Sequence, residues 1–155
     1  MQIEYQQEYP APAEVVWNVL LDPEILARHL PGCKRLDPEG DGAYLATLEI
    51  GLGPVRGTYT GKVAVKDLRP HSSYRLLVEG GGGPGQVKGE GVIQLVPTGH
   101  GSTLLRCVGD ATVTGTLAAV GQRLLGAVAR MIMGNFFSGM GTEIAARAGA
   151  ASSAS

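Results

Sequence analysis

The chain has 155 residues, which is enough for one domain with a sizeable buried core and does not require a second domain. It carries 13 basic and 14 acidic residues, a formal net charge of -1, and no run of Lys or Arg. This balance argues against a nucleic acid as partner, because binding to a phosphate backbone requires clustered positive charge.

The N-terminal segment, residues 1–8, alternates in polarity and predicts a first β-strand. It lacks the basic start and apolar stretch of a secretory signal. No run of about 18 uncharged apolar residues occurs, so no membrane-spanning helix is expected, while peripheral membrane contact stays open. Cys33 and Cys107 have neither zinc-site nor redox-motif spacing, which is typical of reduced thiols in a cytoplasmic protein.

Two short helices are expected next. Pro12 suits the first helical position, and Glu14 complements the helix dipole. Asp22 is expected to cap a second helix with Pro23 in its first turn, and Pro31 is expected to end it. The apolar residues on these two helices are Val16, Trp17, Leu20 and Leu21, then Ile25, Leu26 and Leu30.

Several antiparallel strands follow, and their alternation places small residues on the face expected to be covered. Turn signals separate the strands at residues 38–42, 51–54, 70–73, 80–85 and 97–102. The three rows of covered residues are Val55, Gly57, Tyr59, Gly61, Val63 and Val65; Val87, Gly89, Gly91, Ile93 and Leu95; and Leu105, Cys107, Gly109, Ala111 and Val113. These glycines indicate either bends that let a long sheet curl or space left for a ligand, and both interpretations hold together if a curled sheet forms a concave wall.

From about Thr116 the hydrophobic period changes from two to about 3.6 residues, which predicts a long C-terminal helix. One arc of this helix is expected to cover the sheet, and it contains Leu117, Val120, Leu124, Leu125, Val128, Met131, Ile132 and Phe136. On the opposite side lie Met133, Phe137, Met140 and Ile144. We interpret this second stripe as an exposed docking surface for a second copy of the chain (a homodimer), a partner enzyme or a bilayer surface, with packing under a neighbouring loop as the alternative.

This order of elements predicts an α+β domain at residues 1–148, in which a curved antiparallel sheet wraps around the long C-terminal helix. Residues 149–155 are expected to form a disordered tail. An apolar ligand cavity is expected between sheet and helix. Its expected ligand-binding residues are Leu30, Ile50, Val55, Gly57, Tyr59, Gly61, Leu105, Cys107, Gly109, Leu124, Val128 and Met131.

No catalytic residue, metal ligand or cofactor is predicted. His29, His71 and His100 have no Cys, Asp or Glu at ligand spacing, and no Ser-His-Asp order stands out. The glycine-rich segment 80–85 lacks the Lys and Ser or Thr of a phosphate-binding loop and is interpreted as a mobile hairpin at the opening of the cavity. The Tyr59 hydroxyl needs a partner, either a carbonyl of the guest or a backbone group.

Several motifs resemble known proteins. The run from Ala11 to Trp17, followed by Asp22-Pro23-Glu24, is similar to the first strand-helix junction of the START and Bet v 1 superfamily, the helix-grip proteins. Within that superfamily, four features resemble the CoxG family of carbon monoxide dehydrogenase subunits: Leu30-Pro31-Gly32-Cys33, the stretch from Gly53 to Val63, the glycine-rich stretch from Gly80 to Gly91, and Phe136-Phe137. The resemblance covers nearly the whole chain.

The resemblance implies a helix-grip accessory protein without a redox centre, which serves a molybdenum-containing carbon monoxide dehydrogenase or a related hydroxylase. It implies a hydrophobic, quinone- or lipid-like guest and a place in the cytoplasm, in contact with the inner face of the membrane. Some family members continue into a tail with an apolar anchor, which this chain, ending at Ser155, is expected to lack.

Two other interpretations stay open. One is an enzyme of the polyketide cyclase or dehydratase type, which would require a titratable side chain near Tyr59 in the cavity. The other is an interaction module with a filled core, which predicts no cavity at all.

Overall fold

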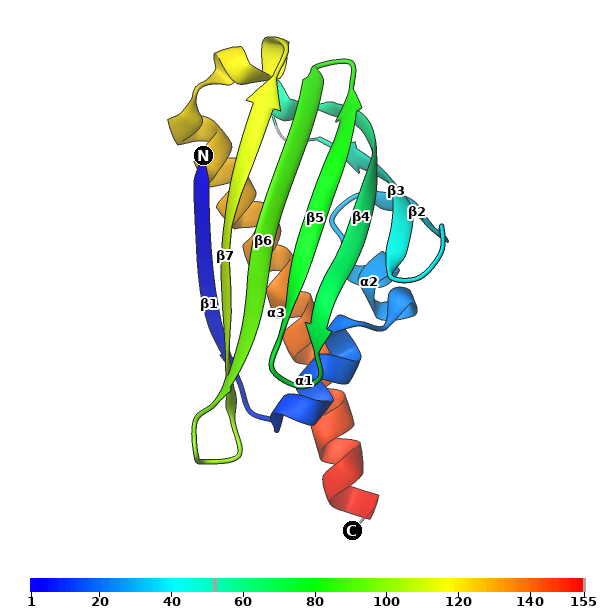
Figure 1. Cartoon of the computed structure of the whole chain (residues 1–155), viewed down its shortest axis with the longest axis vertical. Coiled ribbons are helices and arrows are strands. Elements are labelled where there is room, and N and C mark those ends of the chain that lie inside the picture. Colours follow the sequence, from blue (N-terminus) through cyan, green and yellow to red (C-terminus); the bar gives the residue numbers. More distant parts are fainter. Residues whose placement is uncertain (52, 155) are drawn as a thin grey trace.

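The computed structural model describes residues 1–51 and 53–154. Within these residues, seven strands form one sheet in the order β1-β7-β6-β5-β4-β3-β2 (Figure 1), and each neighbouring pair is antiparallel. The chain leaves the sheet after β1 and re-enters at the opposite edge. The strands are β1 Gln2–Tyr9, β2 Cys33–Pro38, β3 Ala43–Ile50, β4 Gly57–Arg69, β5 Ser73–Gly82, β6 Gly85–Pro97 and β7 Thr103–Thr114.

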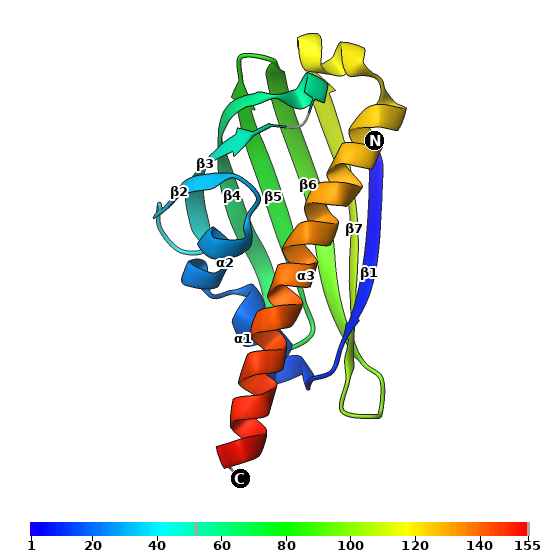
Figure 2. The ribbon, with the colours of Figure 1, turned by 180° about the vertical axis from the view of Figure 1, so that it is seen from behind.

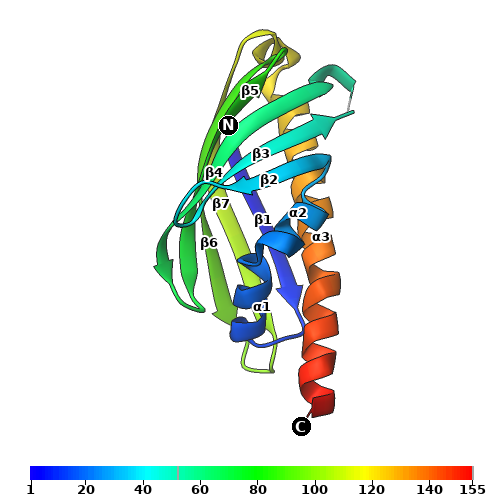
Figure 3. The same ribbon diagram turned by 90° about the vertical axis from the view of Figure 1, so that its right-hand side faces the viewer.

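The helices lie on one side of this sheet. Two short helices, α1 (Ala13–Leu20) and α2 (Pro23–His29), connect β1 to β2. The long helix α3 (Gln122–Ala154) runs diagonally across the strands, with α1 and α2 beside it (Figure 2). Short 3-10 helices precede β4 (η1, Gly53–Val55) and α3 (η2, Thr116–Val120). Figure 3 shows the sheet curving around the helical side. The expected α+β architecture is therefore confirmed.

Local signals explain most element boundaries. The Asp22 carboxylate accepts a hydrogen bond from the backbone N–H of Glu24 at 3.0 Å, so Asp22 caps α2 as expected. Burial alternates along β4, β6 and β7 in the expected rows. Because the side-chain period of a strand is two, a local pattern is sufficient to assign the covered face.

Several boundaries differ from expectation. Pro12 is the N-cap of α1 instead of its first helical residue, and Val55 ends η1 instead of beginning the strand. The helical region does not start at Thr116 as one α-helix, because Gly121, with φ 96°, separates η2 from α3. Gly80–Gly82 belong to β5 instead of a turn, and residues 83–84 alone connect β5 to β6. The expected disordered tail overlaps the end of α3 at 149–154, while Ser155 lies outside the described residues; the division into residues 1–148 and a tail stays a prediction.

The second apolar stripe of α3 is core, which makes the expected docking surface wrong. Phe137, Met140 and Ile144 are 3%, 0% and 0% exposed. The Phe137 ring stacks on that of Tyr5 with centroids 5.0 Å apart. Met133, the fourth residue of the stripe, packs against the same core.

Two residues expected in the cavity, Leu124 and Met131, lie on the opposite, exposed side of α3, each with 45% exposure. The face of α3 that points inward changes along its length, from Leu125 and Ala129 near the start to Met140 and Ile144 near the end. The inward positions follow steps of four residues from Leu125 to Phe137 and again from Met140 to Ile144, with one step of three between Phe137 and Met140. Rows with this spacing are inclined to the helix axis, so a helix that crosses a sheet diagonally buries a stripe that winds around it. One helical wheel averaged over the whole helix misses this drift.

Candidate functional site

An apolar cavity of about 360 Å³ lies between the sheet and the first half of α3, and it is partly open to solvent. Strands β3 to β7 contribute aliphatic side chains to the wall, and η2 and α3 close the opposite side. Typical members of the wall are Leu48, Val63, Val78, Val113, Leu125 and Ile132. The volume falls at the lower end of the range for small-molecule sites, which runs from about 300 to 1,000 Å³.

The wall presents almost only carbon to the cavity. Tyr59 and Thr60 are the residues of the described wall with a side-chain oxygen. The Tyr59 hydroxyl donates a hydrogen bond to the carbonyl oxygen of Val55 at 2.7 Å, so a backbone group satisfies it. Burial raises the pKa of Tyr59 above its ordinary value, which keeps the phenol neutral. Thr60 belongs to the outward row of β4 and is exposed.

Met1 contributes to this wall, and its N-terminal amine carries a positive charge. It donates hydrogen bonds to the Asp110 carboxylate at 3.1 Å and to the carbonyl oxygen of Ala111 at 2.9 Å. Its hydrogen bonds therefore hold the end of β1 against β7. Among the described wall residues, none has a carboxylate, imidazole, thiol, Lys or Arg side chain, so the Tyr59 phenol is the titratable side chain that this wall offers for general acid-base chemistry.

The glycines of the covered rows bring strands together more than they open space. A Cβ on Gly61 would lie 2.9 Å from both the carbonyl oxygen of Glu79 and the Cα of Gly80 on β5. A Cβ on Gly109 would lie 2.8 Å from the carbonyl oxygen of Glu90 on β6. These two glycines therefore allow neighbouring strands to approach closely, and Gly61 also lines the cavity.

Five of the residues expected to bind a ligand lie in the wall: Ile50, Val55, Tyr59, Gly61 and Val128. The others do not line the cavity. Leu30 is the C-cap of α2, and a Cβ on Gly57 would meet the Pro84 side chain at 3.1 Å. Leu105 is fully buried in the main core, and Cys107 packs against that core. Gly109 lies against β6, and Leu124 and Met131 are exposed on α3.

Sequence reasoning missed several wall residues. Val63, Ala111 and Val113 belong to the covered rows, so their alternation could have identified them. The wall residues Ala129 and Met133 were not identifiable in the same way, because their assignment requires the direction in which α3 crosses the sheet. Met133 was instead assigned to the docking surface, and the structure contradicts this.

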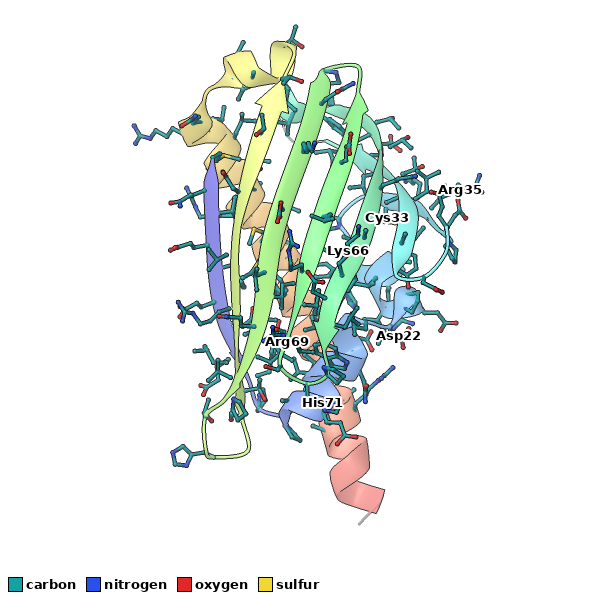
Figure 4. The ribbon with its side chains drawn as sticks, in the orientation of Figure 1. Asp22, Cys33, Arg35, Lys66, Arg69 and His71 are labelled. Atoms are coloured by element: carbon teal, nitrogen blue, oxygen red, sulfur yellow. The ribbon has the colours of Figure 1, made fainter. Side chains whose placement is uncertain are left out.

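The histidines and cysteines lie outside the cavity wall. His29 ends α2 and contacts Glu143, with 3.1 Å between Nε2 and Oε1. His71 lies in the turn between β4 and β5, and Cys33 lies at the start of β2; both residues are labelled in Figure 4. Both cysteines are free, and burial raises the pKa of the Cys33 and Cys107 thiols, which opposes thiolate formation.

A second depression, of about 390 Å³, lies over the outer face of β4 and β5 near Tyr74 and Arg75. The Arg75 guanidinium pairs with Asp67 at 3.1 Å and with Glu90, so its charge is already compensated. Across the residues that the structure describes, no cluster of three metal-ligating side chains occurs, and no described helix meets the length and hydropathy needed to cross a bilayer.

Comparison with known proteins identifies a family whose model matches this chain and solved structures with a similar fold. The family model for the CoxG subunit of carbon monoxide dehydrogenase matches residues 6–145. No curated protein gives a match. A conserved protein from Geobacillus kaustophilus is 41% identical in sequence, with coverage of 94% of this chain and 95% of that chain and a TM-score of 0.91.

Two more distant structures share the fold. The Zhui aromatase/cyclase from Streptomyces sp. R1128 is 19% identical, covers 95% of this chain and 94% of its own, and has a TM-score of 0.72. A START superfamily protein from Mycobacterium smegmatis is 18% identical, with coverage of 92% and 96% and a TM-score of 0.71. At these identities the likeness concerns the helix-grip fold alone.

Proposed function

Because the chain belongs to the CoxG family of carbon monoxide dehydrogenase subunits, we propose that it binds a hydrophobic, quinone- or lipid-like molecule in its cavity and serves a molybdenum-containing hydroxylase of the carbon monoxide dehydrogenase type. The observation that carries the proposal is the aliphatic cavity of about 360 Å³ beneath α3. Burial of apolar surface supplies binding free energy of about 25 cal/mol per Å², so such a wall favours a guest with little polar surface.

The chemistry of the wall supports an accessory role over catalysis. The Tyr59 phenol is neutral and already bonded to the Val55 carbonyl. A cyclase or dehydratase needs a group that accepts or delivers a proton beside its substrate. In this proposal the redox chemistry takes place in the partner enzyme, and the chain either delivers an electron acceptor to that enzyme or brings the enzyme to the membrane from the cytoplasm.

The binding part of the proposal is tested by extracting the purified protein with organic solvent and by native mass spectrometry. Ala111→Leu extends a side chain into the cavity from β7, where Ala111 is 8% exposed. The matched control, Thr112→Leu, alters the next residue on the exposed face of the same strand. We expect an apolar molecule with the wild-type and Thr112→Leu proteins and much less with Ala111→Leu. The proposal fails if the wild-type protein carries no guest and also binds no added prenylated naphthoquinone.

A test of the proposed accessory role requires the partner enzyme. Quinone-loaded protein is added to a carbon monoxide dehydrogenase holoenzyme under turnover, and reduction of the quinone is followed by absorbance. We expect faster reduction with loaded wild-type protein than with loaded Ala111→Leu or with the same amount of free quinone. Equal rates in the three reactions would exclude delivery of an electron acceptor.

A further inference from the structure

We infer that the cavity receives the hydrocarbon end of its guest, while the polar head stays at the opening in contact with water. The inference rests on the proposed function, since it concerns how a molecule sits in that same cavity. It goes further because a hydrophobic guest with a carbonyl or hydroxyl group could enter with either end first.

The first argument is the lack of hydrogen-bond partners inside. The hydroxyl of Tyr59 is bonded to Val55, and the amine of Met1 is bonded to Asp110 and Ala111. The Thr60 side chain lies on the outward row of β4. Because the Tyr59 proton is already donated to Val55, a guest carbonyl that entered this space would lose its hydrogen bonds to water without a replacement from Tyr59, which weakens binding by roughly tenfold or more. A guest hydroxyl would find only the Tyr59 oxygen as an acceptor.

The second argument is size. A volume of about 360 Å³ accommodates roughly a dozen non-hydrogen atoms at about 30 Å³ for each water-sized group. This corresponds to a dodecyl chain or to about two isoprene units. A larger guest has to leave part of itself outside, and desolvation favours leaving out the polar part.

The third argument is the shape and nature of the helical wall. Val128, Ala129 and Ile132 face the cavity from α3, and Met133 adds a flexible thioether that adapts to irregular apolar shapes. Such a wall provides contact area without directional bonds. It therefore selects for a hydrocarbon segment and is tolerant of the head group that the segment carries.

The test is a binding series on the purified full chain, stripped of guest by solvent exchange, with the straight-chain 1-alkanols from hexanol to hexadecanol. We expect affinity to rise about fourfold for each added CH₂ group and to level off near a dozen carbons. Dodecane-1,12-diol, which has a hydroxyl group at both ends, should bind at least about tenfold more weakly than dodecan-1-ol. The tailless head-group compound 2-methyl-1,4-naphthoquinone should not compete with dodecan-1-ol.

A matched pair of variants ties the series to this cavity. Ala129→Leu fills part of the space from α3, and Ala127→Leu makes the same change on the exposed side of the same helix. We expect the plateau to move to chains shorter by about three carbons with Ala129→Leu and to stay in place with Ala127→Leu.

The outcomes distinguish a failure of the tail-first orientation from a failure of the proposed hydrophobic binding. If the naphthoquinone and the diol bind as tightly as dodecan-1-ol, or if affinity is independent of chain length, the tail-first orientation is wrong while a hydrophobic binding protein survives. If neither the alkanols nor the naphthoquinone bind, both the inference and the proposed binding function are wrong.

Discussion

The imidazole ring of His29 lies directly against the backbone of Gly139, in the space that a Cβ on residue 139 would occupy. From there its Nε2 reaches Oε1 of Glu143, one turn further along α3, at 3.1 Å. Arg28 pairs with the same carboxylate at 2.5 Å. A missing side chain on α3 thus allows α2 to dock closely, with His29 and Arg28 both in contact with the Glu143 carboxylate.

This contact predicts that the effect of Gly139→Ala depends on His29. Alanine in a helix interior stabilises the helix by about 1 kcal/mol more than glycine does. At residue 139, however, the added methyl group must displace the His29 imidazole ring. We expect the substitution to lower the free energy of unfolding in the wild-type background and to raise it by about 1 kcal/mol in a His29→Ala background. Urea unfolding of the wild type, the two single variants and the double variant measures this double-mutant cycle. An identical effect of Gly139→Ala in both backgrounds would show that the contact with His29 does not affect stability.

The same contacts predict acid sensitivity. Hydrogen bonds with His29 and Arg28 hold the pKa of Glu143 below its ordinary value of 4.5. A carboxyl group with a lowered pKa in the folded state stabilises the fold above its unfolded pKa, and this contribution is lost as the pH falls below about 4.5. We expect wild-type protein to lose more stability than Glu143→Gln between about pH 5 and about pH 3. Chemical unfolding across this range checks it, and parallel curves for the two proteins would contradict it.

The winding apolar stripe of α3 predicts which truncations destabilise the fold. Phe137→Ala should cost about 3–5 kcal/mol and Ile144→Ala about 2–5 kcal/mol, because both side chains are buried. Leu124→Ala and Met131→Ala, on the exposed side, should change stability by about 0.5 kcal/mol or less. Denaturant titrations followed by circular dichroism measure all four. Comparable losses at the two sides of the helix would refute the assigned face.

The close approach of β4 and β5 predicts that Gly61 tolerates no side chain. In Gly61→Ala the new methyl group meets backbone atoms of β5 at 2.9 Å, and backbone cannot rotate away, so we expect a loss of about 1–3 kcal/mol. Gly89→Ala is the control, since its Cβ would lie 3.6 Å from the carbonyl oxygen of Asp110 and 3.8 Å from the Cβ of Ala111, both ordinary contacts. Thermal unfolding should show little change for the control, and equal melting temperatures for the two variants would be inconsistent with this geometry.

The sequence by itself determined the order of the strands and α-helices, the covered rows of β4, β6 and β7, and the cap of α2, but not the two 3-10 helices. These features depend on interactions between near neighbours, such as the period of two along a strand or the carboxylate of Asp22 at a helix start. The motifs around Leu30 and Gly53 also indicated the family that the match over residues 6–145 shows.

Only the tertiary structure decided which side of α3 faces the sheet and what the inward glycines do. Two apolar stripes on α3 satisfy amphipathicity equally well, and the choice between Met131 and Met140 depends on the angle at which the helix crosses the strands. Whether Gly61 opens space or lets β5 approach depends on its distance to Glu79 and Gly80, which face it on the next strand of the sheet. Both are properties of packing between elements, which local periodicity does not encode.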